Sequence, residues 1–272
     1  MNRRSFLKIT SPIVVLLANG KIVQASEEWL NDSARKKTIL RFVVASDGHY
    51  GQPGTDYENY FSALVSRINE EHQKTPFSFA VINGDIIHDD QKYFPAAKQA
   101  LDKLSMKYYV SQGNHDHATA EEWEKIWKMP VNIDLKFKKN SVLIGTTSNE
   151  RGEYLCPNIS WFEQKLEEHK NQENIFIFIH INPGKLTVHG VDCPELFNLF
   201  AKYPTIRAIF NGHDHDLEGI KVKDKLSFIF DAHFGGNWGT DYRGFRVVEL
   251  RKDQSLVTYI MNPTQKINQA II

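Results

Sequence analysis

Strand-like and helix-like segments alternate along the first half of this 272-residue chain. Residues 38–46 are apolar and β-branched enough for a buried strand, and residues 57–71 carry apolar side chains at the spacing of one helix face. The alternation continues with predicted strands at 77–82 and 107–110 and a predicted helix at 94–104 between them. Such alternation predicts a parallel sheet with right-handed crossovers.

The second half is richer in strands. Residues 133–147 predict a β-hairpin, and a helix at 160–169 follows, with Ser160 as its expected N-cap. The remaining apolar runs predict strands at 175–179 and 206–210, and three or four more in a meander over 218–261. We therefore expect an α/β fold, a four-layer α-β-β-α sandwich in which two mixed sheets pack face to face and helices flank them.

The first 25 residues differ from the rest. Arg3 and Arg4 precede Phe6-Leu7-Lys8, an apolar stretch follows, and Val23-Gln24-Ala25 offers small residues for cleavage. This start resembles the twin-arginine export signal, which implies a substrate of the twin-arginine machinery and a periplasmic or otherwise exported protein. A membrane anchor is the alternative, but an apolar stretch of about ten residues is too short to span ~30 Å of hydrocarbon. We expect no stable membrane span.

Charge and length point to one catalytic domain. Lys plus Arg and Asp plus Glu both number 33, so no net field attracts nucleic acid, and a nuclease is disfavoured. The sequence carries no indication of oligomeric state. The expected organisation is a signal peptide at 1–25, a linker at 26–37, the catalytic domain at 38–262 and a C-terminal tail at 263–272.

The chain has two cysteines, Cys156 and Cys193. Neither lies near the end of the predicted signal, which argues against a lipid-attached protein. In an oxidising compartment the two could form a disulfide, yet two thiols give no framework that a sequence can establish. We favour two buried free thiols and leave the pairing open.

Five short turns carry the chemistry of the chain, and each follows a predicted strand. They are Asp47-Gly48-His49, Asn83-Gly84-Asp85, Gly113-Asn114-His115-Asp116, His180 and Gly212-His213-Asp214-His215. Open α/β sheets build their sites at the carboxyl ends of strands. Taken singly, each turn could be structural, as a helix cap, a turn residue or a core histidine. Carboxylate, imidazole and amide groups without thiolate suit two divalent ions of Mn, Fe, Zn or Co.

The ordered set of turns, over about residues 38–250, resembles the calcineurin-like metallophosphoesterase family, and most closely its class III cyclic-nucleotide phosphodiesterases. The resemblance implies hydrolysis of a small phosphodiester, or a phosphomonoester, by a metal-activated water. It also implies that Asp47, His49 and His215 bind one metal and that Asn114, His180 and His213 bind a second, with Asp85 bridging the two. In the same way it implies that His115 binds phosphate or protonates the leaving group, and that Asp116 orients His115. The alternative is a metal-stabilised protein that binds a phosphorylated ligand without hydrolysing it.

Two departures from the family pattern lie close to proposed metal ligands. His88 stands where purple acid phosphatases carry a tyrosine ligand, and we expect it to be a hydrogen-bonding turn residue. Asn182 lies near the place where many members have a second histidine. Substrate contacts should come from the loops, where local packing is the alternative role; the candidates are Asn182, His233, Trp238, Tyr242 and Arg243, with His117 and His189 nearby.

Overall fold

The structure is a computed structural model, and it describes residues 14–16, 22–23, 38–231, 233–262 and 265–272. Most of the predicted signal peptide, including Arg3 and Arg4, and all of the predicted linker at 26–37 lie outside the described residues. Within the part that is described, no helix combines the length and the apolar composition that a membrane span needs.

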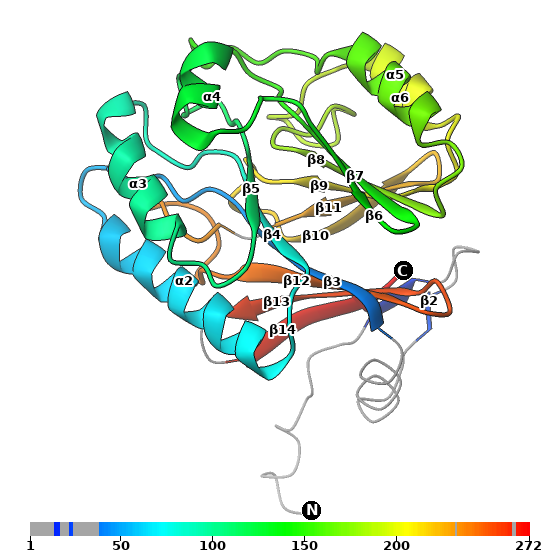
Figure 1. The fold of residues 1–272 in the computed structure, drawn as a ribbon, viewed down its shortest axis with the longest axis horizontal. Coiled ribbons are helices and arrows are strands. Elements are labelled where there is room, and N and C mark those ends of the chain that lie inside the picture. The colour runs from blue at the N-terminus through cyan, green and yellow to red at the C-terminus, as the bar shows by residue number, and fades with distance from the viewer. Residues whose placement is uncertain (1–13, 17–21, 24–37, 232, 263–264) are drawn as a thin grey trace, which may run out of the picture.

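Two β-sheets pack face to face, with helices on the outer side of each (Figure 1). This arrangement confirms the predicted four-layer α/β sandwich. One sheet has the order β2-β1-β14-β13-β12-β3-β4-β5, from β1 (Val14–Leu16), β2 (Ile22–Val23), β3 (Thr38–Ala45), β4 (Phe79–Asn83), β5 (Tyr108–Ser111), β12 (Phe245–Arg251), β13 (Leu256–Asn262) and β14 (Gln265–Ile271). The other has the order β10-β11-β9-β8-β7-β6, from β6 (Ile133–Phe137), β7 (Asn140–Gly145), β8 (Asn174–Ile179), β9 (Ile206–Asn211), β10 (Gly219–Lys223) and β11 (Leu226–Phe230).

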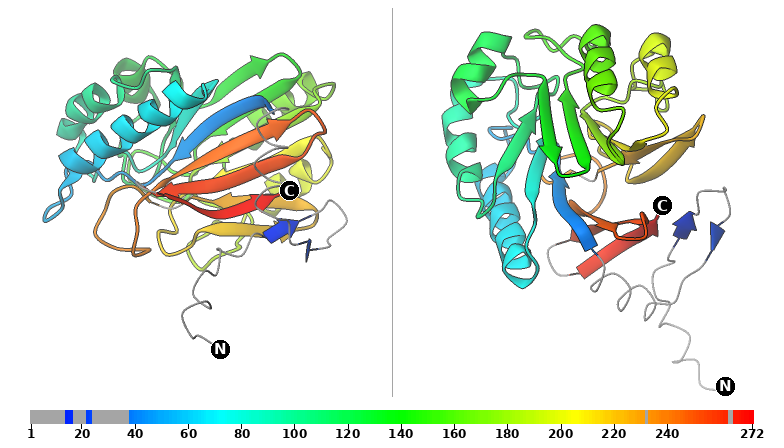
Figure 2. Two further views of the ribbon diagram at one scale, coloured as in Figure 1. Left: turned by 90° about the horizontal axis from the view of Figure 1, so that it is seen from below. Right: turned by 45° about the vertical axis from the view of Figure 1, so that its right-hand side comes forward.

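The helices divide between the two outer faces, as the second viewpoint also shows (Figure 2). Helices α2 (Tyr57–Lys74), α3 (Phe94–Leu101) and α4 (Ala120–Trp127) bury apolar side chains against the first sheet. A 3-10 turn, η2 (Gln91–Tyr93), leads into α3. Helices α5 (Ile159–Glu168) and α6 (Pro194–Phe200) cover the second sheet in the same way.

Aromatic side chains fill the space between the sheets. Phe42 on β3 stacks on Phe79 of β4, with ring centroids 4.9 Å apart, and Phe178 stacks on Phe210 in the second sheet at 4.7 Å. All four rings are fully buried. Burying a side chain of this size contributes roughly 1.5–3 kcal/mol. The packed layer therefore fixes the two sheets relative to each other, and with them the strand ends that carry the predicted turns.

Parallel pairing brings those strand ends together. In the first sheet β3, β4 and β5 run parallel, and in the second β7, β8 and β9 do so. The crossovers pass through α2 and α3 in the first sheet, as predicted. The carboxyl ends of β3, β4, β5, β8 and β9 each lead into one of the five predicted turns. The topology thus delivers five separated segments of sequence to one edge of the sandwich.

Several local predictions were wrong. The residues from 218 to 261 do not form one meander, because β10 and β11 join the second sheet whereas β12 and β13 join the first. The predicted tail contains β14, which pairs with β13 and β1. Helix α5 begins one residue earlier than expected: its N-cap is Asn158, whose side chain accepts a hydrogen bond from the Trp161 amide at 3.0 Å, in place of Ser160. Helices α4 and α6 were not predicted.

The two cysteines form a disulfide, which corrects the favoured prediction of two free thiols. Cys156 and Cys193 have Cα atoms 5.6 Å apart and are bonded through their sulfur atoms. Cys156 is exposed, whereas Cys193 is buried at the N-terminus of α6. The bond joins the segment after β7 to the segment after β8. No spacing rule in the sequence could reveal that these two segments lie side by side.

Candidate metal centre

The five predicted turns meet and hydrogen-bond to one another, through their backbones and through the carboxylates of Asp47 and Asp85. The Asp47 amide donates to the Gly84 carbonyl at 3.1 Å, which joins the first turn to the second. The Gly212 amide donates to the His180 carbonyl at 2.9 Å, which joins the fifth turn to the fourth. A cross-sheet contact completes the set, since the His213 amide donates to Asp47 Oδ1 at 3.0 Å. The turns therefore form one continuous unit at the edge of both sheets.

Several residues of these turns adopt left-handed backbone conformations. Their φ angles are +61° at Asp47, +46° at His49, +51° at Asp85 and +67° at His213. Residues other than glycine seldom adopt this conformation, which costs of order 1–3 kcal/mol each and persists where the surroundings enforce it. These conformations turn the chain sharply after β3, β4 and β9. As a result, carboxylate and imidazole groups from different strands point into one space.

Two motif glycines allow the turns to approach closely. A Cβ atom on Gly113 would lie 2.2 Å from Asp85 Oδ1, and one on Gly212 would lie 2.6 Å from Asp47 Oδ2. These separations are far below van der Waals contact. Each glycine therefore lets a neighbouring turn bring its carboxylate against the backbone, which explains the glycine in the third and fifth turns.

One group of converging donors consists of Asp47, His49 and His215. Their ligating atoms lie within 4.8 Å of one another, and all three residues are buried. His215 Nε2 is 3.1 Å from Asp47 Oδ1 and 3.0 Å from His49 Nε2. This is the set that the family resemblance implies for the first metal.

A second group contains Asp85, His180 and His213, again with ligating atoms within 4.8 Å of one another. Asp85 Oδ2 lies 3.1 Å from His180 Nε2 and 3.8 Å from His49 Nε2 of the first group. Its other oxygen accepts a hydrogen bond from the His115 amide at 2.9 Å. Asp85 therefore stands between the two groups, where a bridging ligand would have to stand.

The chemistry of the second group fits a cation. Asn114 Oδ1 and His213 Nε2 are buried from solvent, and neither atom has a hydrogen-bond partner. His180 Nε2 instead lies 3.1 Å from the Asp85 carboxylate. Leaving a buried polar atom unpaired costs about 1–3 kcal/mol. Both atoms come from residues implied for the second metal. Both are acceptors that a divalent ion could satisfy, so the donor set fits the implied ion.

Hydrogen bonds on the far side of two imidazoles set their protonation. His180 Nδ1 lies 2.6 Å from the Asn83 carbonyl, and His215 Nδ1 lies 3.2 Å from the Trp238 carbonyl. Because a carbonyl can only accept, each Nδ1 carries a proton. This leaves Nε2 as the nitrogen directed at the site. Such outer contacts orient metal-binding histidines and fix their tautomers.

Opposite charges dominate the buried site. Burial disfavours the ionised form of Asp47, but the imidazoles of His215 and His180 hold its pKa well below the ordinary value. Burial also lowers the pKa of His180, yet the carboxylates of Asp85 and Asp47 outweigh it and raise that pKa to about 10. Two ionised carboxylates thus attract positive charge into a dry pocket. Metal binding would displace protons from this pocket, as it does at sites of this kind.

The partner of His115 is not the one that was predicted. Asp116 accepts hydrogen bonds from the amides of Ile86 and Gly113, both at 2.8 Å, so it fastens the second turn to the third. Asp89 accepts from His115 instead, with 2.7 Å between Asp89 Oδ1 and His115 Nδ1. The Asp89 amide also donates to the His115 carbonyl at 3.0 Å. Asp89 therefore orients His115 and leaves Nε2 available for proton transfer.

His88 lies against both neighbouring histidines. Its Nδ1 is 3.1 Å from His49 Nδ1, and its ring stacks on the His115 ring at a centroid distance of 5.0 Å. These three imidazoles form a further group of possible ligating atoms, with His49 shared with the first group. The contact with His49 agrees with the hydrogen-bonding role expected for His88. His117 is more distant, with Nε2 3.9 Å from Asp89 Oδ1.

Four of the five predicted substrate contacts are engaged in local packing. Asn182 bonds to the Thr187 hydroxyl and the Leu186 amide, and both ring nitrogens of His233 face backbone carbonyls. The Tyr242 hydroxyl donates to Glu218, and Arg243 donates to the Gly236 carbonyl. The alternative of local packing describes these four.

Trp238 differs from the other four candidates. Its ring stacks on His215 with centroids 4.3 Å apart, and 42% of the residue is exposed. It therefore covers one flank of the first donor group while keeping surface available to a ligand.

Sequence reasoning missed Asp89 and Tyr154. Asp89 is an acidic residue four positions after Asp85, a weak indication in hindsight because acidic residues are common in turns. Tyr154 belongs to no motif, yet its ring meets the edge of the His213 ring with centroids 5.0 Å apart. Only the fold reveals this contact.

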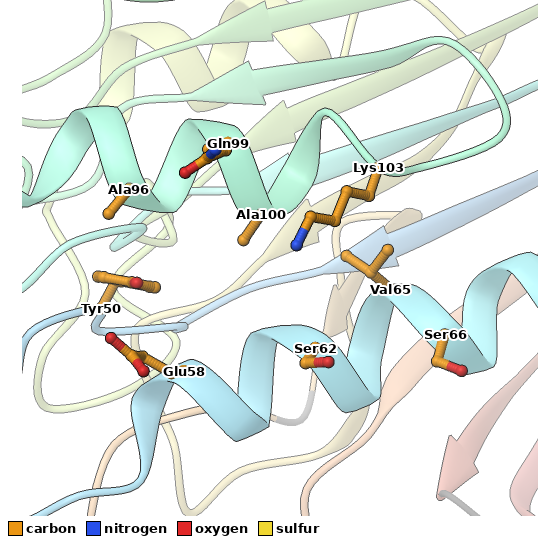
Figure 3. Close-up of a pocket in the computed structure, with 9 residues that line it drawn as sticks. All are labelled: Tyr50, Glu58, Ser62, Val65, Ser66, Ala96, Gln99, Ala100 and Lys103. Atoms are coloured by element: carbon orange, nitrogen blue, oxygen red, sulfur yellow. The ribbon is translucent and has the colours of Figure 1, made fainter.

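Two other features do not belong to the centre. Asp134, Glu168 and His169 also converge, but Lys165 already lies 2.7 Å from Glu168 and 3.5 Å from Asp134. A cleft of about 350 Å³ lies between α2 and α3, beside Tyr50 (Figure 3). None of the residues that line this cleft belongs to either donor group.

Comparisons with known proteins agree with this geometry. The sequence model of the calcineurin-like phosphoesterase family matches residues 40–217. A dimetal phosphatase from Danio rerio is similar in structure, with a TM-score of 0.67 and 12% identity over 85% of this chain and 98% of that chain. The calcineurin-like phosphoesterase YfkN from Bacillus subtilis gives a TM-score of 0.52 and 13% identity over 85% and 94% of the two chains.

A 5'-nucleotidase from Candida albicans gives a TM-score of 0.51 and 12% identity, and the match covers 87% of this chain but 51% of that chain. None of the curated protein sequences compared with this chain matches it. At identities this low, the structural likenesses establish the fold alone.

Proposed function

This chain belongs to the calcineurin-like phosphoesterase family, and from that premise we propose that it is an exported phosphodiesterase that depends on two divalent metal ions. The observation that carries the proposal is the pair of buried acceptors without hydrogen-bond partners at Asn114 and His213. His213 belongs to the second donor group, and Asp85 stands between that group and the first.

The residues assigned to metal binding are those of the two groups together with Asn114. We propose that Asp47, His49 and His215 hold one ion, that Asn114, His180 and His213 hold the other, and that Asp85 contacts both. When bound, two divalent ions supply Lewis acidity toward phosphate oxygens and toward the attacking water. The ligand set suits Mn, Fe, Zn or Co, and elemental analysis of protein purified from its own host would identify the ion.

His115 supplies the acid in this proposal. The Asp89 carboxylate holds the proton on His115 Nδ1, and His115 Nε2 gives its proton to the departing alkoxide oxygen as the P–O bond breaks. The His115 ring lies beside the first donor group, with its centroid 4.9 Å from that of His49. The leaving group would therefore lie on the His49 side of the centre.

The charge of the site favours a diester over a monoester. A phosphodiester carries one negative charge, whereas a monoester near neutral pH carries close to two. Arg243, the cation predicted to grip phosphate, is committed to the Gly236 carbonyl and the Tyr60 ring. Exposed aromatic residues also stand on both flanks of the centre, Trp238 beside His215 and Tyr154 beside His213. Two flanking surfaces suit a phosphate that carries two organic groups.

The test is turnover by purified protein loaded with Mn²⁺. We expect hydrolysis of bis(4-nitrophenyl) phosphate to exceed that of 4-nitrophenyl phosphate. Asp85→Asn should abolish both rates and reduce the bound metal, because it removes the charge shared by the two groups. Asp224→Asn, at an exposed acid in the β10–β11 turn, is the matched control and should behave as wild type.

The second candidate function, ligand binding without hydrolysis, predicts a different result. Wild type would then hold two ions and bind a phosphodiester without releasing nitrophenolate. A faster rate with the monoester would overturn the diester preference and leave the phosphoesterase assignment in place.

Export is supported by the disulfide, because paired cysteines persist in oxidising compartments and are rare in the cytosol. Arg3 and Arg4, the arginine pair of the proposed export signal, lie outside the described residues. Replacing Arg3 and Arg4 together by lysine should retain the protein in the cytoplasm of its host, whereas Lys8→Arg should not. Cell fractionation with detection of the processed chain measures the difference, and equal export of both variants would exclude the twin-arginine route.

A further inference from the structure

Two loops stand over the second donor group and frame the His213 ring. The first, residues 146–158, places the Tyr154 ring 5.0 Å from the His213 ring at an interplanar angle of 87°. The second, residues 182–193, places the His189 ring 6.0 Å from His213, also at 87°. Tyr154 is 45% exposed, and His189 is exposed as well. Both rings therefore border the proposed second metal position and still face solvent.

The position of Tyr154 is fixed by its own loop. Tyr154 forms a β-bridge with Ser148, and the next residue, Leu155, donates its amide to the Thr147 carbonyl at 2.7 Å. The tip of the loop rests on the third motif turn, because a Cβ atom on Gly152 would lie 2.6 Å from the Asn114 carbonyl. Gly152 has a φ of +74°, which favours glycine at this tip.

The second loop is tied to the first. The Cys156–Cys193 disulfide joins the two loops just beyond Tyr154. Inside the second loop, Gly184 bridges Asp192, and the Asn182 side chain binds Thr187 and Leu186. The two linked loops therefore form an ordered side of the site next to His213.

The two loops and the proposed acid border different donor groups. His115 and Trp238 border His49, with ring centroids 4.9 and 4.8 Å from it. Tyr154 and His189 border His213, which belongs to the other donor group. A tetrahedral phosphodiester directs its two organic groups away from each other. If the departing group lies beside His115, the group that stays on phosphorus extends toward Tyr154.

We propose that Tyr154 is a specificity-determining residue, which holds the retained ester group of the substrate by contact with a flat aromatic ring. This inference rests on the proposed phosphodiesterase function. Aromatic rings attract one another in edge-to-face and offset arrangements, beyond the area that they bury. A cleft of about 630 Å³, lined by Val188, His189 and Asp214, lies on the His189 side of the two loops. The favoured substrates are phosphodiesters whose retained alcohol carries an aromatic ring.

The test varies the retained group and keeps the leaving group constant. Bis(4-nitrophenyl) phosphate retains an aryl group, whereas methyl 4-nitrophenyl phosphate retains a methyl group, and both release nitrophenolate. Tyr154→Ala should lower kcat/KM for the aryl diester about tenfold and for the methyl diester less than about twofold. Tyr154→Phe should keep most of the preference. Leu155→Ala, at the neighbouring residue of equal exposure, is the control and should change neither rate.

A binding measurement tests the role of Tyr154 without requiring hydrolysis of the ligand. In calorimetric titrations, Tyr154→Ala should raise the Kd of diphenyl phosphate about tenfold and leave that of dimethyl phosphate unchanged. Equal effects on both ligands, or no effect on either, would overturn the role assigned to Tyr154. Failure of wild type to hydrolyse either nitrophenyl diester would instead count against the proposed function, and the titration would still report on Tyr154.

Discussion

The five motif turns and the two flanking loops differ in what holds them. The turns continue directly from buried parallel strands, and their backbones bond to one another. Asp47, His49 and His180 are fully buried there. The loops leave the sheets and reach solvent, and they are held by short backbone bridges of their own, by one disulfide and by side-chain contacts such as those of Asn182. Val188 at the tip of the second loop is 81% exposed.

This difference separates two tasks. Metal ligands must be placed accurately, and groups carried by rigid strand ends meet that requirement. Substrate groups vary, and loops on a rigid scaffold tolerate change in sequence and length. We therefore expect substitutions in the turns to remove the reaction, and substitutions in the loops to alter which diester is preferred.

The largest contrast should come from two glycines, one in each region. Gly113→Ala places a methyl group within 2.2 Å of Asp85 Oδ1, so the second or third turn must move. A misplacement of about 1 Å costs on the order of 100-fold in rate. Gly184→Ala meets its nearest side chains at 3.3 Å and should change kcat/KM by less than about twofold.

Steady-state kinetics and metal content of both glycine variants make the comparison. A large loss in Gly184→Ala together with a small one in Gly113→Ala would contradict the division between turns and loops. Circular dichroism should show native secondary structure in both variants, so that the loss reflects the site.

A smaller contrast separates two aspartates near His115. Asp89→Asn removes the charge that orients His115 and should lower kcat about tenfold, with stability and metal content unchanged. In Asp116→Asn, an amide group replaces the carboxylate that accepts hydrogen bonds from the backbone N–H groups of Ile86 and Gly113 in the wild type. It should lower the free energy of unfolding by about 1–3 kcal/mol.

Denaturant unfolding and the pre-steady-state rate distinguish these two effects. The family resemblance assigned the orienting role to Asp116. If Asp116→Asn slowed the reaction without affecting stability, that assignment would stand and the Asp89 contact would be incidental.

The same division explains what the sequence could predict. Strand ends were predictable because apolar β-branched runs and the glycine-flanked turns after them are local signals. Six of the seven proposed metal ligands sit in such turns, and His180 directly follows the buried strand β8. Hydrophobic patterning also predicted the four layers. For these features, each local preference agrees with the overall fold.

The missed features depend on contacts between distant segments. Whether a β-rich run joins one sheet or the other is not encoded in its own pattern, so 218–261 was read as one meander. The strand β14 is short of apolar residues and gains its order from pairing with β13. Tyr154 and the Cys156–Cys193 bond share this property. Their roles arise from two loops that lie side by side because β7 and β8 pair in the second sheet.

The smallest expected effect on the rate comes from removing the disulfide. Replacing Cys156 and Cys193 together by serine releases a bond that spans 37 residues. Closing a loop of this length should contribute about 3–4 kcal/mol to the free energy of unfolding in the chain-entropy account. Since the turns hold the proposed ligands independently of the bond, kcat and metal content should persist. KM for bis(4-nitrophenyl) phosphate should rise about threefold, equivalent to roughly 0.6 kcal/mol, because Tyr154 is less well fixed.

Thermal unfolding and steady-state kinetics measure the two effects of the double replacement separately. Treating wild type with a reductant should reproduce the rise in KM, and the serine variant should not respond to reductant. A fall in kcat with KM unchanged would show that the loops shape the metal centre itself. The turns and the loops would then be one unit, and the separation between placing the ions and selecting the substrate would fail.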